Sequence, residues 1–296
     1  MTKTTPHPPP RTETSLESYH DLDTWPLERS LTAIVDSNAV AVEAVRRALP
    51  DLERAAAGIE RALTAGGRLI YLGSGTSGRL AVQDAAELPP TFDFRRAHAV
   101  LAGGNDAGAQ AIEGAEDDED EARARLRALS VTADDAVVGV AASGSTPFTV
   151  AGVTFARAQG AFTVGIANNA GTPLLHAGEV GVLLATPAEV LAGSTRLAAG
   201  TAQKVALNAL STAVLVRLGG AYGNLMVGMR PQNQKLRARA VRMVAQATGC
   251  TPAEAEGALK AGGGVRVAIV TLLTGVSPEA ARERLAKHQN RVREAL

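Results

Sequence analysis

The chain has 296 residues and a formal net charge of zero, from 30 basic and 30 acidic side chains, a balance that gives no support for nucleic acid or an anionic membrane as a partner. Hydrophobic residues make up 46% of the sequence and aromatic residues only 3%, so the core must consist mainly of alanine, valine and leucine. The single cysteine, Cys250, excludes an intrachain disulfide and a cysteine-rich zinc site.

The N-terminal segment, residues 1–26, is expected to be a flexible arm. Residues 1–14 are rich in threonine and proline, a composition typical of disordered segments. The segment lacks the apolar core of a secretory signal, and no run in the chain approaches the roughly 20 apolar residues of a membrane span. These features favour a cytoplasmic protein.

Two helices are expected before the first strand. Apolar residues such as Leu31 and Val42 recur at helical spacing over 27–48, and a second helix is expected over 52–65. Because they precede the sheet, we expect them to pack beside it or against another subunit.

Short apolar strands alternate with helices from residue 68 to about 222. This pattern predicts an α/β fold whose parallel sheet is covered by helices on both faces. Such sheets bind ligands at the carboxyl ends of their strands. The expected strands are 69–72, 98–101, 136–141, 162–166 and 180–184. The expected helices are 78–87, 106–115, 119–129, 147–159 and 194–218.

An alanine-rich helical module is expected after a polar break at 219–237. Two of its helices begin at Thr251 and Ser277, each a hydroxyl cap followed by proline and a first-turn glutamate. We therefore divide the chain into an arm (1–26), a domain that contains the first helices and the sheet (27–237), and a C-terminal helical domain (238–296). The expected helices of this last domain are 239–248, 252–261, 264–274 and 278–294.

The loop after the first strand carries the strongest functional signal. At a strand–loop–helix junction, free backbone N–H groups and the positive end of the helix dipole point at one place. The loop combines glycines, which allow close approach, with hydroxyl donors. We therefore predict a phosphate site rather than an ordinary turn, formed by Ser74, Gly75, Thr76 and Ser77.

A second hydroxyl loop follows the strand at 136–141. Taken alone, Ser143, Ser145 and Thr146 are an ordinary start of a helix. Because the carboxyl ends of neighbouring parallel strands meet at one edge, the two loops together are expected to form a phosphate cradle.

Other chemistries find less support. The first loop has Gly-x-Gly-x-x-Gly spacing, but a dinucleotide site also needs an acidic residue about 20 positions further on, and 95–104 contains none. The five histidines show no metal-ligand spacing, and no Gly-x-Ser-x-Gly elbow with triad partners is present.

Three glutamates near these loops are candidates for chemistry or binding. Glu87 lies at the end of the helix that follows the first loop, and that helix is expected to stop at Pro89-Pro90. Glu113 and Glu116 belong to an acidic run that is typical of a solvated surface, but Glu113 follows an apolar residue in the expected helix 106–115 and can face inward.

These residues resemble a known family. The segment Leu72–Leu80 with Ala86–Phe92 is similar to the sugar isomerase (SIS) domain of N-acetylmuramic acid 6-phosphate etherases, and the C-terminal module resembles that family's UBA-like helical domain. The related glucokinase regulatory proteins share the loop but have a second SIS domain, for which this chain is too short. Further matching segments follow in the family's order at 112–117, 141–144, 193–196, 199–204, 207–212, 223–227 and 235–237.

The resemblance implies a lyase of cell-wall recycling, which cleaves the D-lactyl ether of N-acetylmuramic acid 6-phosphate to N-acetylglucosamine 6-phosphate and D-lactate. It places the family's two catalytic glutamates on Glu87 and Glu113, and it favours Glu87 as the acid and Glu113 as the base. Glu116 is expected to contact the sugar phosphate. A base removes the C2 hydrogen, an acid protonates the leaving ether oxygen, and water then adds. This elimination needs no metal and no redox cofactor.

Helix geometry adds a prediction about assembly. Glu87 would lie about 15 Å along the helix axis from the phosphate loop, which is long for one sugar phosphate. We therefore expect a homodimer in which the loop and Glu87 of one site come from different chains, and the family's homodimers fit this expectation.

The chain departs from the family pattern at four places, which leaves its substrate preference open. No Arg-Asn pair follows Thr12-Glu13, and Ala199, Ser145 and Gly228 replace a common Lys, a common Arg or Lys, and a frequent Asp. Two alternatives stay open: another SIS-domain isomerase that acts on a sugar phosphate, and a non-catalytic regulator that binds one.

Overall fold

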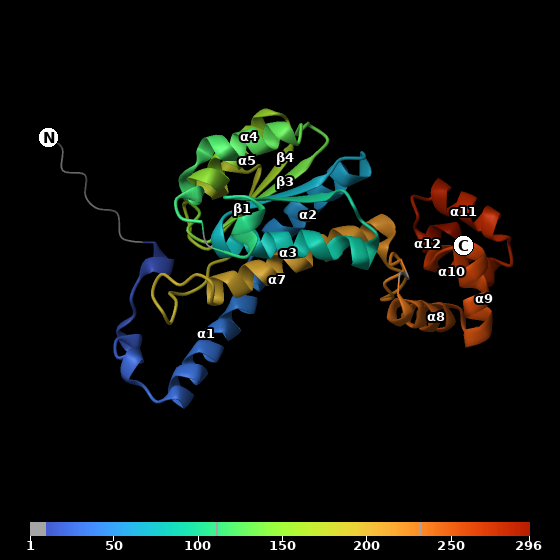
Figure 1. Cartoon of the computed structure of the whole chain (residues 1–296), viewed down its shortest axis with the longest axis horizontal. Helices are drawn as coiled ribbons and strands as arrows, with labels where there is room; N and C mark the ends of the chain where they lie inside the picture. Colours follow the sequence, from blue (N-terminus) through green and yellow to red (C-terminus); the bar gives the residue numbers. More distant parts are fainter. Residues whose placement is uncertain (1–9, 111, 231–232) are drawn as a thin grey trace. The chain divides into compact units, whose positions relative to one another are not determined.

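The computed structural model describes residues 10–110, 112–230 and 233–296 of an α/β protein (Figure 1). The chain separates into two compact units. The first contains the residues up to Ala85 together with His98–Leu210, and the second contains Ala86–Ala97 together with Ser211–Leu296. The three-part division expected from the sequence stays a prediction.

A parallel sheet forms the centre of the first unit. Within the described residues it has five strands in the order β2-β1-β3-β4-β5. Parallel pairing joins β1 to β3, β3 to β4 and β4 to β5. The prediction of an α/β fold with a parallel sheet is therefore confirmed, and each strand matches its expected range within one residue. The strands are β1 (Leu69–Gly73), β2 (Ala97–Leu101), β3 (Ala136–Ala141), β4 (Phe162–Ala167) and β5 (Val180–Leu183).

Helices cover both faces of this sheet, as the pattern predicted. On one face α5 (Pro147–Ala158) packs on β1, β3 and β4, and α4 (Glu119–Ala128) packs against α5 (Figure 1). The buried side chains of Leu72 and Phe148 belong to this layer. On the other face α2 (Leu49–Thr64) packs on β3, β4 and β5.

A buried polar network joins β1 to two helices through residues of the first unit. Side chains alternate between the two faces of a strand. Ile70 and Leu72 pack in the hydrophobic core on one face, so Tyr71 points to the other face. Its hydroxyl donates to the Asp84 carboxylate on α3 (Gly75–Phe92) at 2.6 Å. Asn208 on α7 (Ala198–Leu215) donates to the other Asp84 oxygen at 2.6 Å. The network therefore fixes α3 relative to the sheet.

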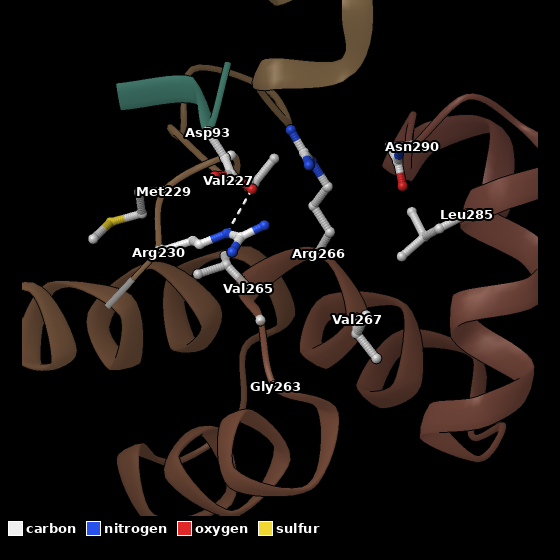
Figure 2. A pocket seen from close by; sticks show the side chains of 12 residues that line it. Asp93, Val227, Met229, Arg230, Gly263, Val265, Arg266, Val267, Leu285 and Asn290 are labelled. Atoms are coloured by element: carbon white, nitrogen blue, oxygen red, sulfur yellow. Dashed lines mark hydrogen bonds and ion pairs between the residues drawn. The ribbon is translucent and has the colours of Figure 1, made fainter. Parts of the chain in front are cut away.

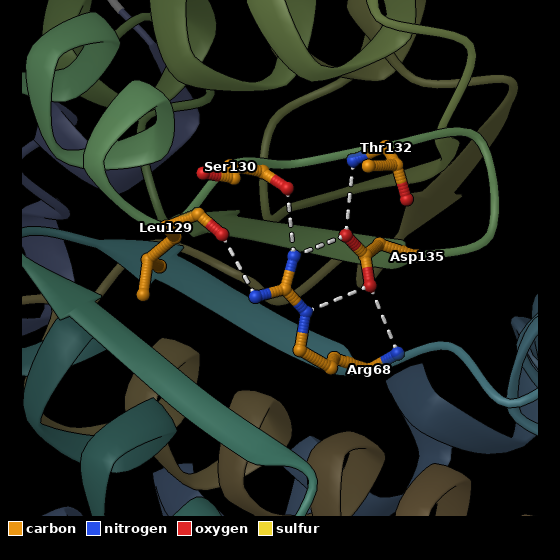
Figure 3. Close-up of polar contacts among 5 residues, drawn as sticks. All are labelled: Arg68, Leu129, Ser130, Thr132 and Asp135. Carbon is orange, nitrogen blue, oxygen red and sulfur yellow. Dashed lines mark hydrogen bonds and ion pairs between the residues drawn. The ribbon is translucent and has the colours of Figure 1, made fainter.

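An ion pair holds β1 and β3 together at their amino ends (Figure 3). The Arg68 guanidinium lies 2.6 Å from the Asp135 carboxylate, and it also donates to the carbonyl oxygens of Leu129 and Ser130. The backbone N–H groups of Arg68 and Thr132 donate to the same carboxylate at 2.9 and 3.0 Å. Burial alone would raise the pKa of Asp135, but these hydrogen bonds outweigh it and lower the pKa below its ordinary value.

Of the remaining helices, α1 and α6 lie in the first unit and the others lie in the second. In the second unit Thr251 forms a capping box with Glu254, and the Ser277 side chain accepts from the Ala280 N–H, so both predicted caps are confirmed.

No single described helix is long and apolar enough to cross a bilayer. Helices α9 and α10 have the length and the apolar composition only when they are taken together, as a pair bent by 116°. The bounds are α1 (Leu27–Arg47), α6 (Pro173–Ala177), a π-helical turn (Val216–Gly220), α8 (Gln234–Thr248), α9 (Pro252–Gly262), α10 (Val265–Thr274), α11 (Pro278–Lys287) and α12 (Val292–Ala295).

Several expected helix boundaries are wrong: α8 begins at Gln234 rather than at 239, α7 begins at Ala198 rather than at 194, and two helix ends also differ. Helix α3 continues through Pro89-Pro90 to Phe92. Proline removes an N–H donor but has a φ that suits a helix, and the Asp93 N–H again donates to the Pro89 carbonyl at 3.0 Å. The helix expected over 278–294 is split into α11 and α12, because Gln289 and Asn290 adopt left-handed φ values of 54° and 62°.

The helix expected over 106–115 is also wrong. Its described residues form only short 3-10 turns, at Asn105–Gly108 and Ala115–Asp117. Within the expected range Gly114 has a left-handed φ of 73°, which a right-handed helix cannot contain. Glu113 therefore lies on a loop.

Candidate active site

A cavity of about 380 Å³ lies at the carboxyl ends of β1 and β3. The loops that follow these strands face each other across it, as expected for a parallel sheet. All eight residues predicted to bind the sugar phosphate line this one cavity: Ser74, Gly75, Thr76, Ser77, Glu116, Ser143, Ser145 and Thr146.

Glycines allow the first loop to turn directly into α3. Gly75 is the first residue of the helix and has a left-handed φ of 51°. A Cβ on Gly78 would lie 2.7 Å from the Gly73 carbonyl oxygen, so the two ends of the loop touch. Ser74 and Ser77 are buried. The free N–H groups and the positive dipole end of α3 therefore open into the cavity beside two hydroxyls.

The second loop brings another helix terminus to the same cavity. Gly144 has a φ of 72°, and a Cβ there would lie 2.1 Å from the Thr172 hydroxyl. The Ser145 N–H donates to the Ser143 hydroxyl at 3.2 Å, which keeps the turn closed. Helix α5 begins directly after Thr146. Two helix N-termini thus border the same cavity, and both favour a bound anion.

The charged side chains that line the cavity are all acidic among the described residues. Its lining contains the carboxylates of Glu13, Glu116 and Asp117, and no lysine or arginine of the described residues lines it. The Ser74 hydroxyl lies 3.5 Å from Glu116 Oε2. A bound phosphate would therefore be held by amide and hydroxyl donors, with the carboxylates left for other parts of the ligand.

Glu113 borders a smaller neighbouring cavity of about 210 Å³. The two cavities share Ser74, Gly75 and Glu116 in their linings. The Glu113 side chain is exposed, and the left-handed Gly114 turns the loop directly after it. Glu113 therefore lies next to the first hydroxyl loop, although not in the expected helix.

Glu87 belongs to the second unit. It lies on α3, in the segment Ala86–Ala97, and its side chain is exposed. The other predicted site residues all belong to the first unit.

The expectation that residues 1–14 are disordered is wrong for 10–14, while 1–9 lie outside the described residues. Arg11–Glu13 forms a 3-10 turn and Thr12 is fully buried. Glu13 and Thr195 also line the cavity, although neither was among the residues predicted from the sequence. Thr195 lies in the matching segment 193–196, and Glu13 lies in the Thr12-Glu13 pair that precedes the missing Arg-Asn pair. The threonine- and proline-rich composition of residues 1–14 indicated disorder instead.

A second cavity, of about 410 Å³, lies within the second unit (Figure 2). Arg230 pairs with Asp93 there at 2.6 Å, and the Arg266 Nε donates to the Gly219 carbonyl at 3.0 Å. Burial lowers the pKa of Arg266 although the Asp93 charge opposes this. Because the Asp93 carboxylate in this cavity already pairs with Arg230, we place the candidate active site at the ends of β1 and β3 instead.

Comparisons with known proteins cover most of the chain. Residues 51–157 match the glucokinase regulatory protein N-terminal SIS domain, and residues 117–213 match the SIS domain. The N-acetylmuramic acid 6-phosphate etherase of Deinococcus radiodurans is 47% identical over 97% of this chain and 95% of its own length. The etherase of Streptomyces coelicolor is 45% identical, covering 100% and 98%, and that of Salmonella typhimurium is 44% identical, covering 96% and 97%. A solved E. coli CFT073 protein has a TM-score of 0.50 at 16% identity, over 64% of this chain and 90% of that one, and is similar in fold.

Proposed function

This chain belongs to the N-acetylmuramic acid 6-phosphate etherase family, and we propose that the cavity at the ends of β1 and β3 holds the phosphate of its substrate. The protein is a carbon–oxygen lyase that cleaves the D-lactyl ether of N-acetylmuramic acid 6-phosphate, giving N-acetylglucosamine 6-phosphate and D-lactate. The observation that carries this assignment is an identity of 44–47% to curated etherases over nearly the whole chain.

The phosphate would bind between the N-termini of α3 and α5. Ser74, Thr76 and Ser77 offer hydroxyls from one side, and Ser143 and Thr146 offer them from the other. Backbone N–H groups at both helix starts add donors and partial positive charge. This set compensates for the missing lysine and arginine in the lining of the cavity.

The chemistry requires one base and one acid. In the open-chain sugar the C1 aldehyde acidifies the C2 hydrogen, and a base takes that proton as the C2–C3 double bond forms. The C3–O bond breaks, and the lactate oxygen leaves with a proton from the acid. Water then adds across the double bond, with hydroxyl at C3 and hydrogen at C2. The acid must hold its proton near neutral pH, whereas the base must not.

We assign these two roles to Glu87 and Glu113. Family resemblance favours Glu87 as the acid and Glu113 as the base. The position of Glu113 beside Ser74 and Glu116 supports a role at this site, since the cavity it borders adjoins the phosphate cavity. No group other than carboxyls is needed for the two proton transfers.

We also propose that the enzyme works as a homodimer with shared sites. Glu87 follows Gly75 by twelve positions in one helix, which at 1.5 Å per residue is about 18 Å along the axis. The exposed side of α1 supports a partner surface, because Leu27, Leu31 and Val35 are 75%, 54% and 67% exposed at helical spacing. Subunits carrying Glu87→Ala, inactive alone, mixed with subunits carrying Glu113→Ala, also inactive alone, should recover activity, because one site of each mixed dimer keeps both glutamates; a mixture without activity would refute shared sites.

The assay that tests the function is D-lactate release from N-acetylmuramic acid 6-phosphate. Glu87→Gln and Glu113→Gln should each abolish release while binding of N-acetylglucosamine 6-phosphate persists. Conversion of glucose 6-phosphate to fructose 6-phosphate without lactate would instead identify an isomerase, and tight binding without turnover would identify a regulator. Because a phosphorylated sugar does not cross membranes freely, we place the reaction in the cytoplasm, as a step of cell-wall recycling.

A further inference from the structure

We propose that Glu13 is a substrate-binding residue, whose carboxylate accepts hydrogen bonds from the neutral donors of the amino sugar, its hydroxyls or acetamido N–H. The inference rests on the proposed function, because it takes N-acetylmuramic acid 6-phosphate as the ligand. Glu13 lines the same cavity as the two hydroxyl loops, although it is far from them in the sequence.

The residue before it anchors Glu13 at the cavity. Thr12 is fully buried, and its N–H donates to Asn169 Oδ1 at 3.3 Å. The Asn169 amide donates back to the Thr12 hydroxyl at 3.0 Å and to the Ala142 carbonyl at 2.9 Å. The Gly193 N–H donates to the Thr12 carbonyl at 3.1 Å. Since Ala142 lines the cavity, this network ties the N-terminal segment directly to the cavity wall.

The Glu13 carboxylate lies close to the backbone of Gly193. A Cβ on Gly193 would lie 3.0 Å from Glu13 Oε2, closer than ordinary van der Waals contact. Gly193 also has a left-handed φ of 78°, which favours glycine. Thr195, two residues further on, lines the cavity as well. The carboxylate therefore passes close to the backbone of the loop that closes the cavity beside it.

Charge decides which part of the ligand Glu13 contacts. An ionised carboxylate only accepts hydrogen bonds, and it repels the phosphate and the lactyl carboxylate of the substrate. The phosphate is accommodated by the amides and hydroxyls at the starts of α3 and α5. Glu13 is left with the sugar hydroxyls and the acetamido N–H, which are donors without charge. In that position it binds the sugar and directs the anionic groups away from its side of the cavity.

The test compares Glu13→Gln with Glu17→Gln. Glu17 is an exposed glutamate in the next 3-10 turn of the same segment, and it lines none of the cavities described above, so it is a matched control. We expect Glu13→Gln to raise KM for lactate release about tenfold, the equivalent of one charge-assisted hydrogen bond of about 1.4 kcal/mol. Inhibition by inorganic phosphate should stay as strong or become stronger, since a negative charge is removed. Glu17→Gln should match the wild type in both measurements.

A second variant tests the anchor. Thr12→Val keeps the shape of the side chain but cannot accept the hydrogen bond from Asn169. It should raise KM in the same direction, with unchanged inhibition by phosphate as the sign that the cavity is intact. A KM for Glu13→Gln within twofold of the wild type overturns the proposal, and so does an equal weakening of substrate binding and phosphate inhibition.

Failure of the proposed function is distinguishable from failure of this inference. If the wild-type protein releases no lactate, the proposed function is wrong. Calorimetric binding of N-acetylglucosamine 6-phosphate to the wild type and to Glu13→Gln then still decides the role of Glu13. About tenfold weaker binding by the variant supports it, and equal binding refutes it.

Discussion

Replacing Asp135 by asparagine tests how β1 and β3 are held at their amino ends. Each carboxylate oxygen accepts two hydrogen bonds: Oδ1 from the Arg68 N–H and Nε, and Oδ2 from Arg68 Nη2 and the Thr132 N–H. In asparagine one oxygen remains as an acceptor, but an NH₂ group replaces the other. The two donors that faced the replaced oxygen lose their acceptor. Two hydrogen bonds to a charged group are lost at about 1.5 kcal/mol or more each. The Asp135 side chain is only 3% exposed, so we expect a loss of about 3 kcal/mol in unfolding free energy.

The measurement is urea unfolding followed by far-UV circular dichroism, at several pH values. Because the folded-state pKa of Asp135 is lowered, its stabilisation is present above the ordinary value of about 3.9 and is lost as the pH falls through the folded value. The difference between wild type and variant should be constant near neutral pH and shrink below about pH 4. Asp134→Asn, at the exposed neighbouring position, is the control. A loss below about 1 kcal/mol at pH 7, or a difference that grows in acid, would refute the reasoning.

Three further predictions concern the site, the core and the second unit. Ser77→Ala should raise KM for lactate release about tenfold with little change in kcat, because it removes one phosphate donor; initial rates decide this, and an unchanged KM would remove Ser77 from the phosphate site. Phe148→Ala should lower the free energy of unfolding by about 3–5 kcal/mol, since this side chain is fully buried on the sheet. A calorimetric loss of under about 1 kcal/mol would contradict this expectation. Thr251→Ala should cost about 1 kcal/mol through loss of the capping box of α9, and a thermal scan with an unchanged midpoint would contradict this.

The periodicity of the sequence was sufficient to predict the sheet. Runs such as Ala136–Ala141 are apolar throughout and bounded by turn residues, and every residue of that strand is buried. A short segment that is apolar along its whole length is most simply buried as a central strand of a parallel sheet. For the same reason the two hydroxyl loops could be placed at one edge, since parallel strands end together.

Local patterns predicted less about loops and termini. Gly114, which has a left-handed φ, lies inside the helix that was expected around Glu113, and Pro89-Pro90 did not end α3. These outcomes depend on whether the surrounding structure compensates for lost backbone hydrogen bonds, which neighbouring residue types do not specify.

By itself the sequence determined the α/β class, the strands, the position of the two hydroxyl loops at one edge of the sheet and, through family resemblance, the reaction. Only the tertiary structure decided that the segment around Thr12 is anchored, that Glu13 reaches the cavity, and that Glu113 lies on a loop beside Ser74. The physical reason is the range of the interactions. Helix and strand patterns arise from neighbours along the chain, whereas Thr12 and Asn169 are 157 positions apart, and their pairing exists only once the fold has brought them together.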